Sequence, residues 1–384
     1  MQPRIYGHLL QQALGDKRIV MLLWARQTGK TTLLRYFQQQ HPELLSTFLS
    51  MEDPLIRETC NHHPYEVFSL IKHPRTAKQL LFIDEVQLLD NPSNFLKLLY
   101  DTYQDTLKIY VTGSSSFYLD KKYQDSLAGR KTIFTIRTLT FTEYCRFREK
   151  HLQEDDLLYE WEQYVRFGGF PGLVGIQDEQ LKKQWLQDYL FSLVQKDVYE
   201  TKIEHETKFF DLMKILASQT GALVNVHEIA NTLHLASQTV EKYIRVLQKW
   251  FHCALISPFS TNIRSELTKM RKIYRYDLGL RNVLLNNFSL LEERQDKGAI
   301  VENIFFREKL FTHPLEGIQF RRTAAGQEVD FVVEREQAYE IKYQEDKRYK
   351  PIKSFVTKYP EIPLQMVSYA DIRTQTMTHT YSLS

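Results

Sequence analysis

Residues 18–40 read RIVMLLWARQTGKTTLLRYFQQQ, and this stretch decides the fold of the amino-terminal part. Its apolar start predicts a buried strand, and a helical pattern begins at Thr31. The loop between them has the order and context of a Walker A loop, in which backbone amides and the helix dipole bind phosphate. Lys30 would contact the β- and γ-phosphates of a nucleotide, and the Thr31 hydroxyl would ligate Mg²⁺. The expected nucleotide-binding residues are Arg26, Gln27, Thr28, Gly29, Lys30, Thr31 and Thr32.

One position departs from the Walker A pattern GxxxxGK[ST]. The first glycine of the pattern falls on Trp24, and a large indole is unusual at this turn. A chance Gly-Lys-Thr between a strand and a helix is therefore the alternative interpretation of the loop.

A second apolar strand, at 80–83, ends in Asp84 and Glu85 and is typical of a Walker B strand. Asp84 would hold Mg²⁺ directly or through water, and Glu85 would orient and polarise the attacking water. Taken singly, the segment could also be a buried strand that ends in a polar turn. Its place downstream of the Walker A loop favours a site for nucleotide hydrolysis.

Two weaker signals follow along the chain. The strand-like run 109–112 leads into small hydroxyl residues, where Ser114 or Ser115 would sense the γ-phosphate; a plain turn is the alternative. Arg130 follows Leu127-Ala128-Gly129 and would stabilise transition-state charge, in cis or from a neighbouring subunit. A solvated surface arginine is the alternative for Arg130.

The composition is that of an ordinary globular protein. The 384 residues carry a net charge of +3, and 43% of them are hydrophobic, 13% aromatic and 25% charged, which excludes a disordered or collagen-like chain. Cys60, Cys145 and Cys253 form no CxxC pair, and no zinc motif occurs among the histidines. No apolar run is long enough for a membrane span and no signal peptide is visible, so we expect a cytoplasmic protein without membrane contact.

The order of strand-like and helical patterns predicts several α/β modules. Buried strands alternate with helices in the first part, which favours a parallel sheet of the P-loop NTPase class. Helical segments follow, and the last hundred residues become β-rich. We expect an ATPase domain at 1–145, a helical lid at 146–205, a winged-helix domain at 206–280 and a carboxy-terminal α/β domain at 281–384.

A helix-turn-helix is predicted in the middle of the chain. Residues 227–233 and 237–250 read as two short helices around a tight turn, and an apolar run at 253–256 suits the first strand of a wing. The second helix would offer Gln238, Thr239, Lys242 and Arg245 to DNA. A basic stretch follows, in which Tyr274 and Tyr276 would stack on bases. Its basic residues are Arg264, Lys269, Arg271, Lys272 and Arg275. A structural lid or protein dock, with a solvated hairpin, is the alternative.

The carboxy-terminal part carries a pattern of acidic residues. Asp330 ends a strand-like run, Glu340 and Lys342 share one face of the next, and Glu302 lies in an upstream helical pattern. This is the arrangement of the PD-(D/E)xK nucleases. Glu302, Asp330 and Glu340 would bind Mg²⁺, and Lys342 would stabilise the charge of the reacting phosphate. Surface strands often carry such residues, so a binding module without cleavage is the alternative.

Taken together, the chain resembles the AAA-type ATPases of bacteria and archaea that have a restriction-endonuclease-like carboxy-terminal domain of uncharacterised function. The segments that carry the resemblance are 25–34, 82–87, 112–116, 127–130, 139–144, 168–171, 272–280 and 328–331. The resemblance implies an ATPase core, a helical and winged-helix middle and a nuclease-like end. Trp24 departs from the family's usual glycine.

These observations lead to two functional hypotheses. In the first, the protein binds ATP and Mg²⁺, and a Mg²⁺-dependent ATPase is coupled to a nuclease-like, DNA-directed carboxy-terminal domain. In the second, it is a regulatory ATPase switch that binds protein partners and has no nuclease activity. A homo-oligomer is compatible with either hypothesis.

Overall fold

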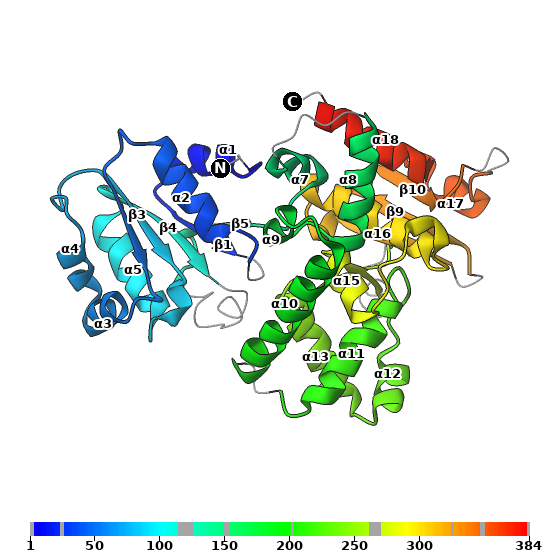
Figure 1. Cartoon of the computed structure of the whole chain (residues 1–384), viewed down its shortest axis with the longest axis horizontal. Helices are drawn as coiled ribbons and strands as arrows, with labels where there is room; N and C mark the ends of the chain where they lie inside the picture. Colours follow the sequence, from blue (N-terminus) through cyan, green and yellow to red (C-terminus); the bar gives the residue numbers. More distant parts are fainter. Residues whose placement is uncertain are drawn as a thin grey trace. The chain divides into compact units, whose positions relative to one another are not determined.

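A five-stranded sheet forms the centre of the amino-terminal unit, Met1–Arg137. The structure is a computed structural model that describes residues 4–23, 27–113, 126–148, 154–200, 203–260, 270–323, 326–345 and 350–381. The strands are β1 (Ile19–Leu23), β2 (Ser46–Ser50), β3 (Gln79–Asp84), β4 (Leu107–Gly113) and β5 (Lys131–Thr135). They lie in the order β2-β3-β4-β1-β5, and all neighbours are parallel (Figure 1). The predicted parallel α/β sheet is confirmed.

Helices cover both faces of this sheet because side chains alternate along its strands. From α2 (Lys30–Gln40), Phe37 packs on the face that holds Phe82 and Tyr110. From α5 (Pro92–Tyr103), Leu96 and other apolar residues share the core of the opposite face with Leu81. The remaining helices of the unit are α1 (Gly7–Gln12), α3 (Pro54–His62) and α4 (Val67–Leu70), with a 3₁₀ turn, η3 (Val86–Leu88), after β3.

The second unit, Thr138–Ser384, begins with helices. These are α7 (Phe141–Phe147), α8 (Glu154–Phe167), α9 (Pro171–Val174), α10 (Glu179–Glu200), α11 (Glu206–Ser218), α12 (Val226–Leu233) and α13 (Ser237–Lys249). The last two are joined by a short turn, and β6 (Cys253–Ile256) pairs antiparallel with β7 (Lys272–Arg275) after them. The two helices and the strand after them match the segments predicted from the sequence; their assignment to a winged helix stays a prediction.

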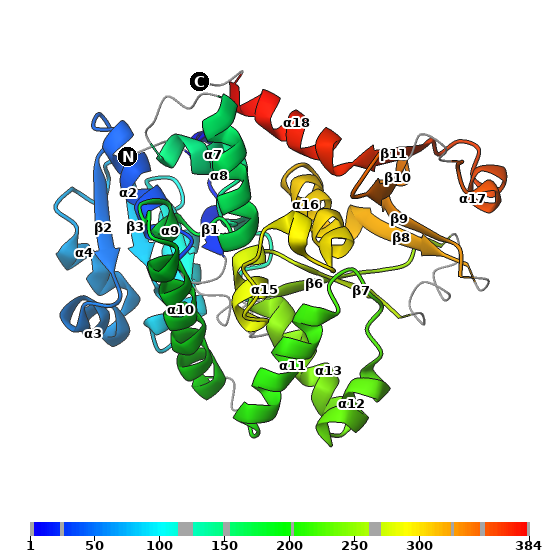
Figure 2. The same cartoon turned by 45° about the vertical axis from the view of Figure 1, so that its right-hand side comes forward.

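A mixed four-stranded sheet follows in the same unit. Its strands β8 (Ile318–Arg322), β9 (Glu328–Val333), β10 (Gln337–Lys342) and β11 (Leu364–Ser368) lie in the order β11-β10-β9-β8, and only the β10–β11 pair is parallel. Figure 2 shows α16 (Lys297–Thr312) against this sheet. Phe305 of α16 packs 4.9 Å from Tyr339 and 5.2 Å from Phe331, measured between ring centroids. The other α-helices of this unit, among the residues described, are α15 (Leu278–Leu284), α17 (Lys353–Lys358) and α18 (Tyr369–Tyr381).

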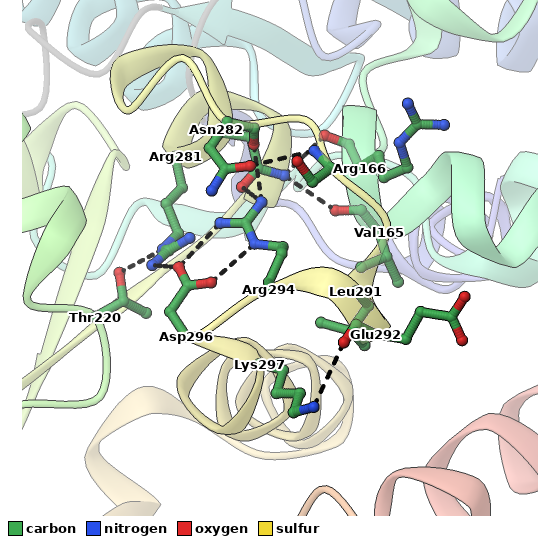
Figure 3. Close-up of polar contacts among 12 residues, drawn as sticks. Val165, Arg166, Thr220, Arg281, Asn282, Leu291, Glu292, Arg294, Asp296 and Lys297 are labelled. Atoms are coloured by element: carbon green, nitrogen blue, oxygen red, sulfur yellow. Dashed lines mark hydrogen bonds and ion pairs between the residues drawn. The ribbon is translucent and has the colours of Figure 1, made fainter.

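Two polar centres hold the helical segments of this unit together. Asp277 accepts hydrogen bonds from the backbone N–H groups of Gly169 and Gly279, both at 2.9 Å. A Cβ on Gly169 would lie 2.6 Å from the Leu139 carbonyl oxygen, which explains the second glycine of the Gly-Gly-Phe-Pro segment. In Figure 3, Asp296 lies between two arginines, 2.6 Å from Arg281 and 2.8 Å from Arg294.

The later segments of the chain form one compact unit. One large core extends from Phe167 to Phe288, and another combines residues of α7 and α8 with residues of the second sheet. The expected borders at 205 and 280 fall inside this unit, and the chain passes from the first compact unit to the second at 137–138. The division of the chain into four domains stays a prediction. Of the helices that the structure describes, none has the length and apolar character needed to cross a membrane.

Candidate functional site

Three neighbouring strands of the amino-terminal sheet end at one edge. Because β3, β4 and β1 are parallel and adjacent, their carboxyl ends lie together, which is where α/β sheets bind ligands. The residues that follow these ends are Glu85, the segment after Gly113, and the loop before α2. The topology therefore brings the Walker A and Walker B candidates to a single site.

The loop before α2 has the backbone that a phosphate-binding turn needs. Gln27 has φ 58° and Gly29 has φ 84°, and the left-handed region at Gly29 favours a residue without a Cβ. The helix begins at the next residue, the buried Lys30. Arg4 donates a hydrogen bond of 2.8 Å to the Thr28 carbonyl oxygen and a second one to the Arg137 carbonyl oxygen. Arg4 thus fixes the loop from outside the motif.

Asp84 is the polar centre of this site. It is buried, and its carboxylate accepts hydrogen bonds from the Thr31 hydroxyl at 2.8 and 3.0 Å. The Thr112 hydroxyl is a second donor, at 2.5 Å from Asp84 Oδ1. The hydroxyls and the carboxylate are hard oxygen ligands of the kind that Mg²⁺ prefers, so these residues fit that cation.

Glu85 is held in a defined orientation beside Asp84. Its φ of 54° places it in the left-handed region, which is uncommon for a residue with a side chain. Its backbone N–H donates to the Thr112 hydroxyl at 2.9 Å, and Gln87 Nε2 donates to Glu85 Oε2. A non-glycine residue in this conformation at a strand end is a feature often found at functional sites.

Thr112 is the residue of this site that sequence reasoning missed. It is fully buried at the end of β4 and joins Asp84 to Glu85 through one hydroxyl. The available signal was its place as the first hydroxyl residue at the end of that strand. The residues expected in this role, Ser114 and Ser115, lie outside the described residues, as do Trp24 and Arg26.

Two other residues predicted for the nucleotide site, Thr32 and Arg130, lie at different places in the fold. Thr32 is exposed on α2, in the turn that follows the loop. Arg130 lies next to Ile19 at the beginning of β1, whereas the phosphate-binding loop follows the end of that strand. There Arg130 donates to Asp101 at 2.7 and 3.2 Å. The prediction that Arg130 acts on the nucleotide site of its own chain is therefore wrong. Its action on the site of a neighbouring subunit stays a prediction.

The second unit brings the expected carboxylates together. Asp330 of β9 accepts a hydrogen bond from the Ile341 N–H of β10 at 2.8 Å, and Lys342 donates to Glu340 at 2.8 Å. Glu302 reaches the same region from α16 and accepts a 3.0 Å hydrogen bond from the Tyr274 hydroxyl. We call Glu302, Glu328, Asp330 and Glu340 the carboxylate cluster.

A lysine from another element lies among these carboxylates. The side chain of Lys272, the first residue of β7, is 3% exposed. Its Nζ lies 3.5 Å from Glu302 Oε2 and 3.7 Å from Asp330 Oδ1, and it also forms an ion pair with Glu328. From the sequence, Lys272 was expected to belong to an accessible basic stretch, because the neighbouring residues gave no indication that its side chain is buried.

Burial controls the protonation of the cluster. It raises the pKa of Glu302 to about 7, with a further contribution from the charge of Asp330. Burial likewise raises the pKa of Asp330 and of Glu340. It opposes the charge of Lys272, but Glu302, Asp330 and Glu328 outweigh it and raise the pKa of that ammonium.

The carboxylate cluster does not fit a metal ion in this arrangement. The Lys272 ammonium already lies between Glu302 and Asp330, where a shared cation would have to bind. In the part of the chain that the structure describes, no group of three or more histidine, cysteine or acidic side chains is placed to hold a metal. The roles expected for Glu302, Asp330 and Glu340 as metal ligands, and for Lys342 in catalysis, stay predictions.

The two helices predicted to form a helix-turn-helix, α12 and α13, present only part of the expected surface. Gln238, Lys242 and Arg245 are exposed on α13, and Thr239 is half-buried. Tyr274 is fully buried, 4.9 Å from Phe306 and 5.2 Å from Phe331 between ring centroids. The expectation that Tyr274 stacks on bases is wrong, because its ring belongs to the core.

The lysine and the arginine of β7 are buried, so they do not contribute to the basic surface predicted to contact DNA. Lys272 lies in the carboxylate cluster, and Arg275 is 1% exposed. Tyr276 is half-buried, and Arg264 and Lys269 lie outside the described residues.

Three family models match parts of the chain. Residues 16–145 match a model described as an AAA domain. Residues 158–291 and 297–382 match models described as domains of unknown function, DUF8612 and DUF4143. The first match covers the sheet and the phosphate-binding loop, and the other two cover most of the second unit.

The relatives found are themselves uncharacterised. A protein of Methanocaldococcus jannaschii is 26% identical over 377 residues, which cover 92% of this chain and 82% of that protein. A protein of Mycobacterium tuberculosis is 26% identical over 339 residues, which cover 87% of this chain and 72% of that protein.

Solved structures show weaker likenesses. A RuvB mutant of Thermotoga maritima is 17% identical with a TM-score of 0.33, covering 65% of this chain and 87% of that one. A DNA replication initiation factor is 14% identical with a TM-score of 0.32, covering 79% and 92%. Neither likeness assigns a function to this chain. The family match and the strand-end geometry together identify residues 16–145 as an AAA-type P-loop ATPase domain.

Proposed function

We propose that the protein is a Mg²⁺-dependent ATPase whose site is formed by the loop before α2 with Lys30 and Thr31, and by Asp84, Glu85 and Thr112. The observation that carries the proposal is the hydrogen bonding of Asp84 by the hydroxyls of Thr31 and Thr112 beside the phosphate-binding loop. Thr31 and Asp84 would hold the cation, which when bound neutralises phosphate charge. A buried carboxylate already surrounded by hydroxyls has little reorganisation to make on binding.

The other residues of the site have separable roles. The loop amides and the amino terminus of α2 bind the phosphates, and Lys30 adds a positive charge beside them. Glu85, held through its N–H by Thr112 and through its carboxylate by Gln87, accepts a proton from the attacking water. Glu85 is thus the base, while Lys30 and Asp84 serve binding.

Steady-state ATP hydrolysis and equilibrium binding of a fluorescent ATP analogue test these roles. In Glu85→Gln, we expect analogue binding to be retained and kcat to fall about 100-fold or more, since a positioned base contributes roughly 10²–10⁴-fold. In Lys30→Ala, binding itself should weaken. The matched control is Glu43→Gln, which removes an exposed carboxylate of the same unit. Wild-type protein that binds no ATP, or Glu85→Gln that hydrolyses like wild type, would contradict the proposal.

For the second unit we propose a binding role on DNA without cleavage. The supporting observation is the exposed face of α13, the second helix of the helix-turn-helix, with Lys242 and Arg245. Metal-dependent cleavage is not proposed, because Lys272 lies among the carboxylates that would be needed. In this proposal the carboxy-terminal domain keeps a nuclease-like fold without nuclease activity.

Fluorescence anisotropy with labelled duplex DNA, with and without ATP, tests this role. Lys242→Ala should weaken binding several-fold and reduce its salt dependence, since one phosphate contact is lost. Lys249→Ala, at the other end of the same helix, is the matched control. No DNA binding, or equal effects of the two substitutions, would favour the other hypothesis, an ATPase switch that binds protein partners.

A further inference from the structure

The carboxylate cluster is built from one helix and two strands, and its cation comes from another strand. Glu302 lies on α16, Asp330 on β9 and Glu340 on β10, whereas Lys272 begins β7, more than fifty residues before Asp330. Removing two charges of one sign from water is costly unless an opposite charge accompanies them. The cluster therefore needs a cation, and the chain supplies one.

We propose that Lys272 is the resident cation of the carboxylate cluster: its ammonium occupies the place of a divalent metal and keeps metal ions out. Because the lysine is part of the chain, its positive charge is always present in the cluster and competes with any metal ion. The inference does not depend on ATP hydrolysis, which takes place in the other unit.

The position of Lys272 is fixed by its backbone as well as by its charge. Its strand pairs with β6, where Lys272 lies opposite Ile256, and Lys272 also forms a bridge with Leu223 on its other side. Its Nζ lies 5.7 Å from the centre of the Phe320 ring. Lys272 therefore has backbone partners on both sides, and its side chain is buried.

The other charged residues around the cluster show which carboxylates would lose their cation if Lys272 were replaced. At the border of the cluster, Lys342 donates to Glu340 and Arg322 lies 3.4 Å from Glu328, so these two carboxylates keep a basic partner without Lys272. Glu302 and Asp330 would then face each other without the cation between them. Glu340 is buried, and within the described part of the chain its Oε2 has no hydrogen-bond partner. These three carboxylates are the hard oxygen ligands that Mg²⁺ and Mn²⁺ bind.

Mn²⁺ binding, counted by electron paramagnetic resonance of the free ion, tests the proposal. Every protein is the full chain in an Asp84→Asn background, which removes the carboxylate of the nucleotide site. Without further change, we expect no Mn²⁺ site tighter than about 1 mM. Lys272→Met should gain one site per chain, with affinity at least tenfold above that limit, and adding Asp330→Asn should abolish it.

Lys342→Met is the matched control, because it removes an ammonium from the same region but leaves Lys272 in place. It should bind no more Mn²⁺ than its parent. If Lys272→Met fails to fold, Lys272→Met/Glu328→Gln removes one charge of each sign and still leaves Glu302, Asp330 and Glu340.

Three results would overturn the proposal. The first is an Mn²⁺ site in the parent protein that Asp330→Asn removes, because metal and Lys272 would then share the cluster. The second is a folded Lys272→Met variant, judged by circular dichroism, that binds no Mn²⁺. The third is an equal gain in Lys342→Met. Failure of ATP hydrolysis would leave all three readouts unaffected, so the two proposals are tested separately.

Discussion

Thr112→Val is the perturbation that examines the nucleotide site most directly. The substitution keeps the shape of a fully buried side chain and replaces its hydroxyl with a methyl group. Asp84 loses a 2.5 Å donor, and the N–H of Glu85 loses its 2.9 Å acceptor. A hydrogen bond to a charged group contributes about 1.5–3 kcal/mol, and an unpaired buried N–H costs about 1–3 kcal/mol. We expect the amino-terminal unit to lose about 3 kcal/mol.

Thr112→Ser is the matched control. It keeps the hydroxyl and loses one buried methyl group, at a cost of about 1 kcal/mol. The two variants should therefore differ by about 2 kcal/mol, which is roughly 30-fold in the unfolding equilibrium. Only Thr112→Val should also lower kcat for ATP, because Glu85 is then no longer held at its backbone.

Hydrogen exchange of the β3 and β4 amides in the full chain, measured by mass spectrometry in increasing urea, gives the stability of this unit. ATP hydrolysis is measured on the same samples. The reasoning would be refuted if the two variants had the same opening free energy within about 0.5 kcal/mol. Equal kcat values would refute the role of Thr112 in positioning Glu85.

Two further predictions concern the second unit, which contains Trp161, Trp185 and Trp250 as fluorescent probes. Asp277→Asn places an amide where two buried glycine N–H groups donate, so urea unfolding should show a loss of about 2–3 kcal/mol; a loss below about 0.5 kcal/mol would contradict this. Burial opposes ionisation of Asp296, but Arg294 and Arg281 outweigh it and lower its pKa. Wild-type stability should therefore fall as pH decreases below about 4, and Asp296→Asn should flatten this dependence; parallel pH curves would count against it.

The local patterns of the sequence predicted most of the elements. Lys30 and Thr31 could be assigned because a strand, a short loop and a helix follow one another within a few residues. Asp84 and Glu85 could be assigned because they end an apolar strand downstream of that loop. The same holds for the two helices at 226–233 and 237–249 and for the strands that carry Asp330 and Glu340, whose periodicity is a property of the segment itself.

Contacts between segments that are distant along the chain could not be predicted from the sequence. Thr112 meets Asp84 because β3 and β4 are adjacent, and the pairing of β5 with β1 places Arg130 at the far end of its strand from the phosphate-binding loop. Tyr274 and Lys272 looked like an accessible basic and aromatic stretch, yet both are buried. Sequence by itself determined which residues carry chemical groups and which elements hold them. The tertiary structure decided which of these groups meet, because strand order and burial depend on how the whole chain packs, and this is what placed the Lys272 ammonium among the carboxylates.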